Sequence, residues 1–155
     1  MLSMIILDQF NKVRSWSIGE AESLSEDIVN VQPEGFNNTI KWHLGHIITE
    51  TEYFLFELTR MEVKLPNTYN DFFAPGTKPA TWQGESPLLS ELVSSLKIQA
   101  ERVHLLSEEK LVHKLDKPKH GFNTAADSVS FSVLHESLHL GQLISMKQMI
   151  KYTSK

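Results

Sequence analysis

The chain has 155 residues with no cysteine, 41% apolar and 22% charged residues, and a formal net charge of −4. These values are typical of one ordinary globular domain, and they exclude a disordered chain, a collagen-like chain, a disulfide scaffold and any site built on a cysteine thiolate of the chain itself. Lysine and arginine gather in no patch that could neutralise phosphates, so we expect no nucleic-acid partner.

The sequence also shows no sign of export or of membrane insertion. Its N-terminal segment, MLSMIILDQF, lacks the cationic start and the small-residue cleavage site of a signal peptide. No apolar run approaches the ~18 residues that a membrane span needs. We therefore expect a cytoplasmic protein that makes no membrane contact and folds as a single domain over residues 1–155.

The first apolar pattern predicts a helix from Ser3 to Val29, because apolar or small residues recur every three or four positions. This stripe consists of Ile6, Phe10, Val13, Ser17, Ala21, Leu24 and Ile28. A proline and a glycine then interrupt the pattern, and either Asn37 or Asn38 is a suitable cap for the next helix.

A second helix is predicted from Thr39 to Arg60, with a stripe at the same spacing: Ile40, Leu44, Ile47, Thr51, Phe54 or Leu55, and Leu58. Residues 61–86 carry turn-forming residues and no period, which predicts a long loop. A loop of this length is what a bundle needs when its second and third helices run parallel. Its aromatic residues indicate that it packs against the domain: Tyr69, Phe72, Phe73, Trp82 and the nearby Phe56.

A third helix is predicted to begin at Ser86 and Pro87, a favourable cap and first position, and to end near Glu109. Its stripe is Leu89, Leu92, Leu96, Val103 and Leu106. A fourth helix is predicted from a Thr124 cap to Tyr152, and its stripe is Phe131, Leu134, His135, Leu138, Gln142 and Met149, with His139 and Met146 at the edge. No strand pattern is convincing, so the fold class is all-α: a four-helix bundle with a long crossover between helices two and three.

The chemistry of the chain is concentrated in its seven histidines. His135 and His139 lie one turn apart on one face of the fourth helix, so both imidazoles can reach one metal ion. A buried pair of rings without partners would cost several kcal/mol in desolvation, which a shared metal offsets. The alternative is a set of buried histidines satisfied by carboxylates and backbone, with His104, His113 and His120 as surface residues.

Residues 135–139 also match the H-E-x-x-H motif of zinc proteases, in which Glu136 would act as the base. Such proteases take a further ligand downstream, and no Asp, Glu or His follows His139. The third ligand must therefore come from upstream, where helix two offers His43 and His46. At about 100° per residue, His43 lies about 60° and His46 about 120° from the centre of the stripe. Periodicity alone therefore favours His43.

Three stretches of the chain resemble the DinB-like family: NTIKWHLGHI at 38–47, FAPGT at 73–77, and His135 and Glu136 followed by HLGQL at 139–143. This family of metal-binding four-helix bundles includes the YfiT-like proteins and bacterial thiol S-transferases, and many members are homodimers. The resemblance spans nearly the whole chain. It implies a divalent metal held by His46, His135 and His139, with water completing the shell, and it leaves His43 as the alternative ligand from helix two.

A divalent metal at such a site lowers the pKa of bound water to ~7 or ionises a bound thiol. Since the chain has no cysteine, a thiol would have to arrive as a low-molecular-weight cosubstrate. The resemblance favours transfer of such a thiol to an electrophile. The alternatives are a metal-dependent hydrolase and a non-catalytic, metal-stabilised dimeric protein that binds a small molecule. Zinc, nickel, iron, copper and manganese all remain candidates for the metal.

Three further residues are candidates for a catalytic role. Glu50 lies one turn after His46, so its carboxylate is a candidate to orient that ring or to accept a proton, and Glu136 is a second candidate for the same roles. Gln142, on the predicted inner face, is a candidate to hydrogen-bond the water on the metal. The alternatives are solvated helix carboxylates and a satisfied core amide.

Overall fold

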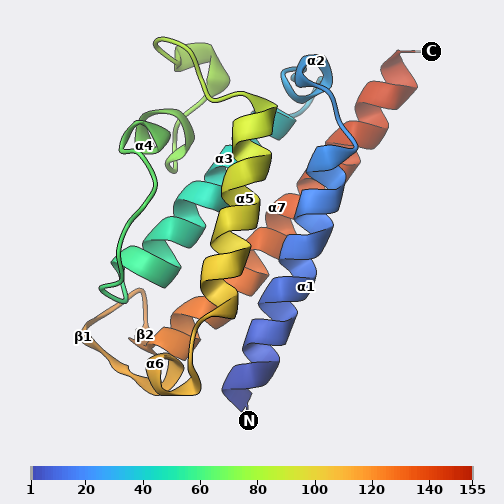
Figure 1. Ribbon diagram of the computed structural model, residues 1–155. Helices are drawn as coiled ribbons and strands as arrows, with labels where there is room; N and C mark the ends of the chain where they lie inside the picture. The colour runs from blue at the N-terminus through green and yellow to red at the C-terminus, as the bar shows by residue number, and fades with distance from the viewer. Residues whose placement is uncertain (1, 155) are drawn as a thin grey trace.

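The computed structural model describes residues 2–154, and these residues are mostly helical (Figure 1). The α-helices are α1 (Leu2–Glu22), α2 (Glu26–Val29), α3 (Ile40–Thr51), α4 (Thr68–Phe73), α5 (Leu89–His104), α6 (Glu108–Val112) and α7 (Ala125–Thr153). The remaining elements are the π-helix η1 (Glu52–Glu57), the 3₁₀ turn η2 (Pro79–Thr81), and the strands β1 (Lys114–Lys119) and β2 (Phe122–Thr124).

The four longest helical segments pack in a ring of neighbours, in which α1 and α3 each contact both α5 and α7. Between α3 and α7, His43 contacts His139. His46, one turn further along α3, contacts His135, one turn back along α7. The two helices are therefore antiparallel, and α7 runs the length of the molecule beside α1 (Figure 1).

The second and third long helices run parallel, as the long connection between them predicts. Gln99 of α5 donates to the Ile48 carbonyl of α3. Further along both helices, Arg102 of α5 contacts Glu52 at the start of η1. The segment between η1 and α5 therefore crosses back over the whole length of α3, and its α4 packs on that helix (Figure 1). The predicted aromatic anchors of this segment, Tyr69 and the pair at 72–73, are buried.

Several predicted helix boundaries are wrong. The first predicted helix breaks after Glu22, where Ser25 caps the short α2 through the Ile28 N–H. The second continues beyond Thr51 as a π-helix, in which the Leu58 N–H donates five residues back to the Tyr53 carbonyl. A periodicity count includes neither the cap nor the change in hydrogen-bond spacing, and it therefore misplaced both limits.

The third predicted helix is also shorter than expected. It ends at His104, and residues 114–124, predicted to be a connection, form a two-stranded antiparallel ribbon of β1 and β2. His120 and Gly121 make the turn with positive φ of 56° and 82°, and such a conformation favours glycine.

Helix caps come from residues next to those predicted. Thr39, not Asn37 or Asn38, caps α3 by accepting from the Trp42 N–H. Ser86 does not cap α5, because that helix starts two residues past Pro87 and its N-cap is Leu88. Only the cap of the last helix is confirmed. The Thr124 hydroxyl accepts from the Asp127 N–H, while the Asp127 carboxylate accepts from the Thr124 N–H.

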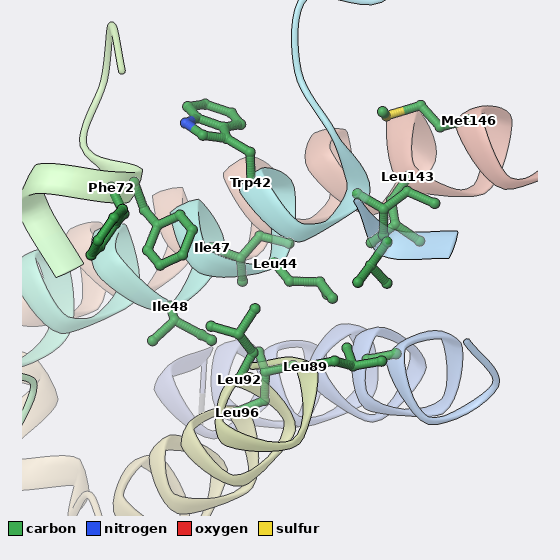
Figure 2. Packing of buried hydrophobic residues seen from close by; sticks show 14 of the residues in the cluster. Trp42, Leu44, Ile47, Ile48, Phe72, Leu89, Leu92, Leu96, Leu143 and Met146 are labelled. Atoms are coloured by element: carbon green, nitrogen blue, oxygen red, sulfur yellow. The ribbon is translucent and has the colours of Figure 1, made fainter. Parts of the chain in front are cut away.

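The core confirms the stripes predicted for the first three long helices. Leu44 and Ile48 of α3 are directed toward Leu92 and Leu96 of α5, whereas Trp42 lies on the opposite side of α3 (Figure 2). All four aliphatic residues are less than 2% exposed. This packing holds α3 at a fixed rotation, and α4 covers its other side. Nearly every residue of α3 is consequently buried, His43 and His46 included.

The stripe predicted for α7 is wrong. Leu134 and Leu138 are exposed, and so are Gln142, Phe131 and Met149. The buried face instead carries alanine, serine and glutamate beside larger residues: Ala125, Ser128, Val129, Ser132, Glu136, Leu140, Leu143, Met146 and Ile150. Both faces contain apolar residues, so the hydrophobic pattern of α7 does not distinguish inside from outside. Among residues 2–154, no helix combines the length and apolar character needed to cross a membrane.

Candidate metal centre

Three histidines converge where α3 passes α7. His46 of α3 and the pair His135 and His139 of α7 each offer a ring nitrogen, and the three nitrogens lie within 4.8 Å of one another. The Nε2 atoms of His46 and His135 are 3.2 Å apart. The antiparallel packing of the two helices brings these residues together, although 89 positions separate His46 from His135 in the sequence.

The ring of His46 is held by the crossover segment. Its Nδ1 is 2.7 Å from the Phe73 carbonyl oxygen. Because a carbonyl can only accept, Nδ1 carries the hydrogen and Nε2 keeps its lone pair on the side of His135. Trp42 stacks on the same ring, with centroids 4.5 Å apart and planes 12° from parallel. This orientation depends on a backbone carbonyl, a group that no side-chain pattern in the sequence predicts.

Gly45 allows the crossover segment to approach this closely. A Cβ at position 45 would lie 2.3–2.4 Å from ring atoms of Phe73, so a larger residue would push α4 away from α3. Thr77 ties the residues after α4 to α3. Its hydroxyl accepts from the Trp42 indole N–H, and its one hydrogen lies within reach of the backbone carbonyls of residues 72 and 74. The glycine thus permits the contact that orients the His46 ring.

The three imidazoles are neutral near pH 7. Burial, followed by the neighbouring histidines, lowers the pKa of His135 to about 4 and that of His139 to about 3. Burial also lowers the pKa of His46, although its hydrogen bond to Phe73 acts in the opposite direction. Neutral rings keep a nitrogen lone pair, which is the form in which histidine binds a metal.

These pKa shifts predict that the metal-free protein loses stability in mild acid. In the unfolded chain the rings titrate near 6.5, so between pH 6.5 and about 4 the unfolded state binds more protons than the folded state. Stability therefore falls as the pH falls through this window. We expect the melting temperature of metal-free protein to be about 5–10 °C lower at pH 4.5 than at pH 7.5.

Circular dichroism melts across this pH range test the prediction. The double variant His135→Ala, His139→Ala is the matched control, because it lacks two of the shifted groups and should show a clearly smaller dependence. Equal pH dependence in both proteins would show that these histidines are not the origin of the effect.

The donor set fits a divalent metal. Three neutral imidazoles suit zinc and its first-row neighbours, and three protein ligands leave a coordination position open. With metal–nitrogen bonds of about 2.0–2.1 Å, two ligands of a tetrahedral ion lie about 3.3 Å apart. The 3.2 Å separation of the His46 and His135 nitrogens matches this spacing.

The surroundings of the three rings are partly aromatic and partly open. Phe54 and Phe131 lie beside His135, with ring centroids 6.4 and 6.0 Å away. Phe54 also lines a cavity of about 350 Å³, together with Glu50, Ala74 and the hairpin residue His120. A larger cavity, about 950 Å³, lies between η1, α6 and β1. His46, His135 and His139 line neither cavity, but the smaller one shares Phe54 with the surroundings of His135.

The predicted catalytic residues lie in three different environments. Glu50 lines the cavity one turn from His46, and burial raises the pKa of its carboxyl. Glu136 is fully buried on the inner face of α7 and paired with Arg14, which rules out a solvated carboxylate. Gln142 is exposed, so the prediction that it lies on the inner face is wrong. The catalytic roles of all three residues stay predictions.

The remaining histidines divide into two groups. His104 and His113 are exposed, as expected of surface residues. His120 is also exposed, but at the hairpin turn it contacts the Tyr53 hydroxyl over 3.1 Å. His43 is different, since it is buried and its Nδ1 lies 2.9 Å from Nδ1 of His139. It does not belong to the set of three whose nitrogens lie within 4.8 Å of one another.

Comparison with known proteins identifies the family. A model of the DinB superfamily matches residues 9–143. Among solved structures, a conserved protein from Enterococcus faecalis superposes with a TM-score of 0.64 at 14% identity, with 96% of each chain covered. This likeness shows a shared fold. No protein in a search of curated proteins matches the chain. The chain belongs to the DinB superfamily.

Proposed function

We propose that this protein is a metal-dependent enzyme in which His46, His135 and His139 hold a divalent ion, and that it transfers a low-molecular-weight thiol to an electrophile. The observation that carries the proposal is the convergence of three neutral imidazoles from two antiparallel helices. We interpret α3 and α7, which carry these rings, together with α1 and α5 as the predicted four-helix bundle, with the crossover segment packed on its second helix.

The bound metal would supply a Lewis acid that favours the ionised form of a thiol. Residues of the chain itself orient the site and accept the proton of the thiol. The Phe73 carbonyl and the Trp42 ring hold His46 in one orientation. Phe54 and Phe131 contact each other and place apolar rings beside His135. Glu50 is the proton acceptor, because its carboxylate lines the adjoining cavity and its raised pKa favours taking up a proton.

A thiol nucleophile would have to come from outside, because the chain has no cysteine. The cavity of about 350 Å³, which shares Phe54 with the surroundings of His135, is large enough for a small molecule. Apolar residues line part of this cavity, including Val63 and Leu65, while Asn67 and Asn70 supply amides that can hydrogen-bond a polar cosubstrate. Water in place of the thiol would make the protein a hydrolase.

Metal analysis of protein purified without a histidine tag, followed by a thiol-dependence assay, tests the proposal. We expect about one equivalent of metal per chain and metal-dependent conjugation of glutathione, cysteine or coenzyme A to an electrophilic fluorogenic bimane. The metal-free protein and the His135→Ala, His139→Ala variant are controls. Ester hydrolysis that needs no thiol would favour the hydrolase, and stoichiometric metal with neither activity would favour a non-catalytic binding protein.

We also propose that a second copy of the chain covers the exposed apolar face of α7. This face carries Phe131, Leu134, Leu138, Met149 and Tyr152 at helical spacing, all between 39% and 78% exposed. The two charged residues of α7 between Phe131 and Met149 do not oppose such a contact, because Glu136 is buried and Lys147 pairs with Glu20. A neutral, apolar stripe can pack against its own copy across a twofold axis without repulsion.

Replacing Leu138 by glutamate is expected to convert a dimer to a monomer, because the two copies of residue 138 would bring like charges into the apolar contact. Light scattering after size-exclusion chromatography measures the mass. Leu105→Glu is the matched control, since Leu105 is 81% exposed but belongs to the C-terminal cap of α5. A wild-type protein that is monomeric at about 100 μM would contradict the proposal.

A further inference from the structure

A fourth histidine touches the candidate metal centre without belonging to its ligand set. His43 is only 4% exposed, and its Nδ1 lies 2.9 Å from Nδ1 of His139. Its place is set by α3, where its backbone N–H donates to the Thr39 carbonyl at the helix start. The edge of its ring meets Trp42, with centroids 5.3 Å apart and planes 88° from parallel. His43 thus contacts both Trp42 and His139, one of the three proposed ligands.

Two neutral imidazole nitrogens at this distance must share one hydrogen, and two arrangements are available. If His139 donates from Nδ1 to His43, its Nε2 keeps a lone pair. If His43 donates instead, His139 carries its hydrogen on Nε2, the nitrogen on the far side of the ring from His43. Burial lowers the pKa of His43 to about 4, so a doubly protonated ring at this position is not the resting form near neutral pH.

We infer that His43 is a positioning residue, which accepts the Nδ1 hydrogen of His139 and so leaves the Nε2 lone pair of that ring for the metal. The role parallels that of the Phe73 carbonyl, which accepts the Nδ1 hydrogen of His46. Hydrogen-bond acceptors behind ligating histidines commonly fix the tautomer and ring orientation in this way. The inference rests on the proposed metal site and assigns a separate function to the histidine that periodicity had favoured as the ligand.

Two variants of His43 separate hydrogen bonding from packing. His43→Phe keeps an aromatic ring but removes the acceptor, whereas His43→Gln keeps a side-chain oxygen that can accept from His139. His104→Phe, on the exposed face of α5, is the matched control. Zinc affinity is measured by competition with a chelating dye. We expect His43→Phe to weaken zinc binding about 10–100-fold, His43→Gln to restore most of the loss, and the control to change affinity less than twofold.

Nitrogen-15 spectra of the histidine rings in the zinc-loaded wild-type protein show which ring nitrogen carries a hydrogen and which binds the metal. A merely structural role of His43 would not fix this pattern. We expect a protonated Nδ1 and a metal-bound Nε2 for His139, and a protonated Nε2 for His43. Because it uses the wild-type protein, this measurement tests whether His43 accepts the Nδ1 hydrogen of His139 even if His43→Phe fails to fold.

Three results would overturn the assignment. Equal zinc affinity of wild type and a folded His43→Phe variant would remove the positioning role while the metal site stands. A fourth imidazole nitrogen in the X-ray absorption spectrum, lost in His43→Gln, would make His43 a ligand. A wild-type protein that binds no zinc or other divalent ion would overturn the proposed function itself, and the inference with it.

Discussion

Alanine at position 46, 135 or 139 is expected to abolish stoichiometric metal loading. Each substitution leaves two imidazoles. Among residues 2–154 no carboxylate joins the converging nitrogens, and the chain has no cysteine, so no other ligand replaces the lost ring. Losing one of three ligands removes a large part of the binding free energy, so we expect affinity to fall by at least about a thousandfold. Metal content after dialysis, measured by mass spectrometry, provides the test.

The matched controls are His113→Ala and His120→Ala, which remove exposed histidines and should leave loading unchanged. Metal loading of the two α3 variants, His43→Ala and His46→Ala, tests which histidine of this helix is the ligand. If His43→Ala removed the metal entirely and His46→Ala did not, the ligand from α3 would be His43. The inferred positioning role instead predicts a smaller, graded loss of affinity at position 43.

Glu136→Gln is expected to destabilise the protein by about 3–5 kcal/mol, because it leaves the charge of Arg14 buried without a counter-ion. Both residues are 0% exposed, and the guanidinium meets the carboxylate through two nitrogens, at 2.9 and 2.8 Å. The other hydrogen bonds of Arg14 go to neutral groups, which cannot replace the lost charge: the Thr51 hydroxyl, the Gln99 side chain and the Leu96 carbonyl. Urea unfolding of metal-free protein measures the change.

Two comparisons make this prediction specific. Lys147→Ala breaks the partly exposed pair with Glu20, and should cost less than about 1 kcal/mol. The double variant Arg14→Leu, Glu136→Leu removes both buried charges and should recover much of the stability lost in Glu136→Gln. A cost below about 1 kcal/mol for Glu136→Gln would show that the buried charge is relieved in another way, for example by water.

The buried pair also explains why the H-E-x-x-H match does not describe a protease site. In an α-helix, consecutive residues are rotated by about 100°, so Glu136 points away from the face that carries His135 and His139. The side chain of Glu136 enters the core, where it joins α7 to α1 through Arg14. The chain therefore carries the H-E-x-x-H sequence, but its two histidines belong to the candidate metal site and its glutamate belongs to a buried ion pair.

Short-range patterns in the sequence predicted several features of this protein correctly. The stripes of the first three long helices, the Thr124 cap and the long connection depend on side-chain spacing and turn chemistry, which act over a few residues. The face of α7 was predicted wrongly because Leu134 and Leu138 are as apolar as Leu140 and Leu143. Apolar character alone does not reveal which of two apolar faces meets the core and which stays exposed.

Composition and spacing by themselves determined that the chain is helical, that any metal must be bound without cysteine, and that His135 and His139 share a helix face. Periodicity alone favours His43, and the family resemblance implies His46 instead. The tertiary structure places His46 with His135 and His139, because α4 buries the side of α3 that a stripe count assigns to solvent. It also placed the Phe73 carbonyl behind His46 and His43 behind His139. Such contacts join residues far apart in the chain, and their energies depend on how helices rotate and pack, which no local pattern encodes.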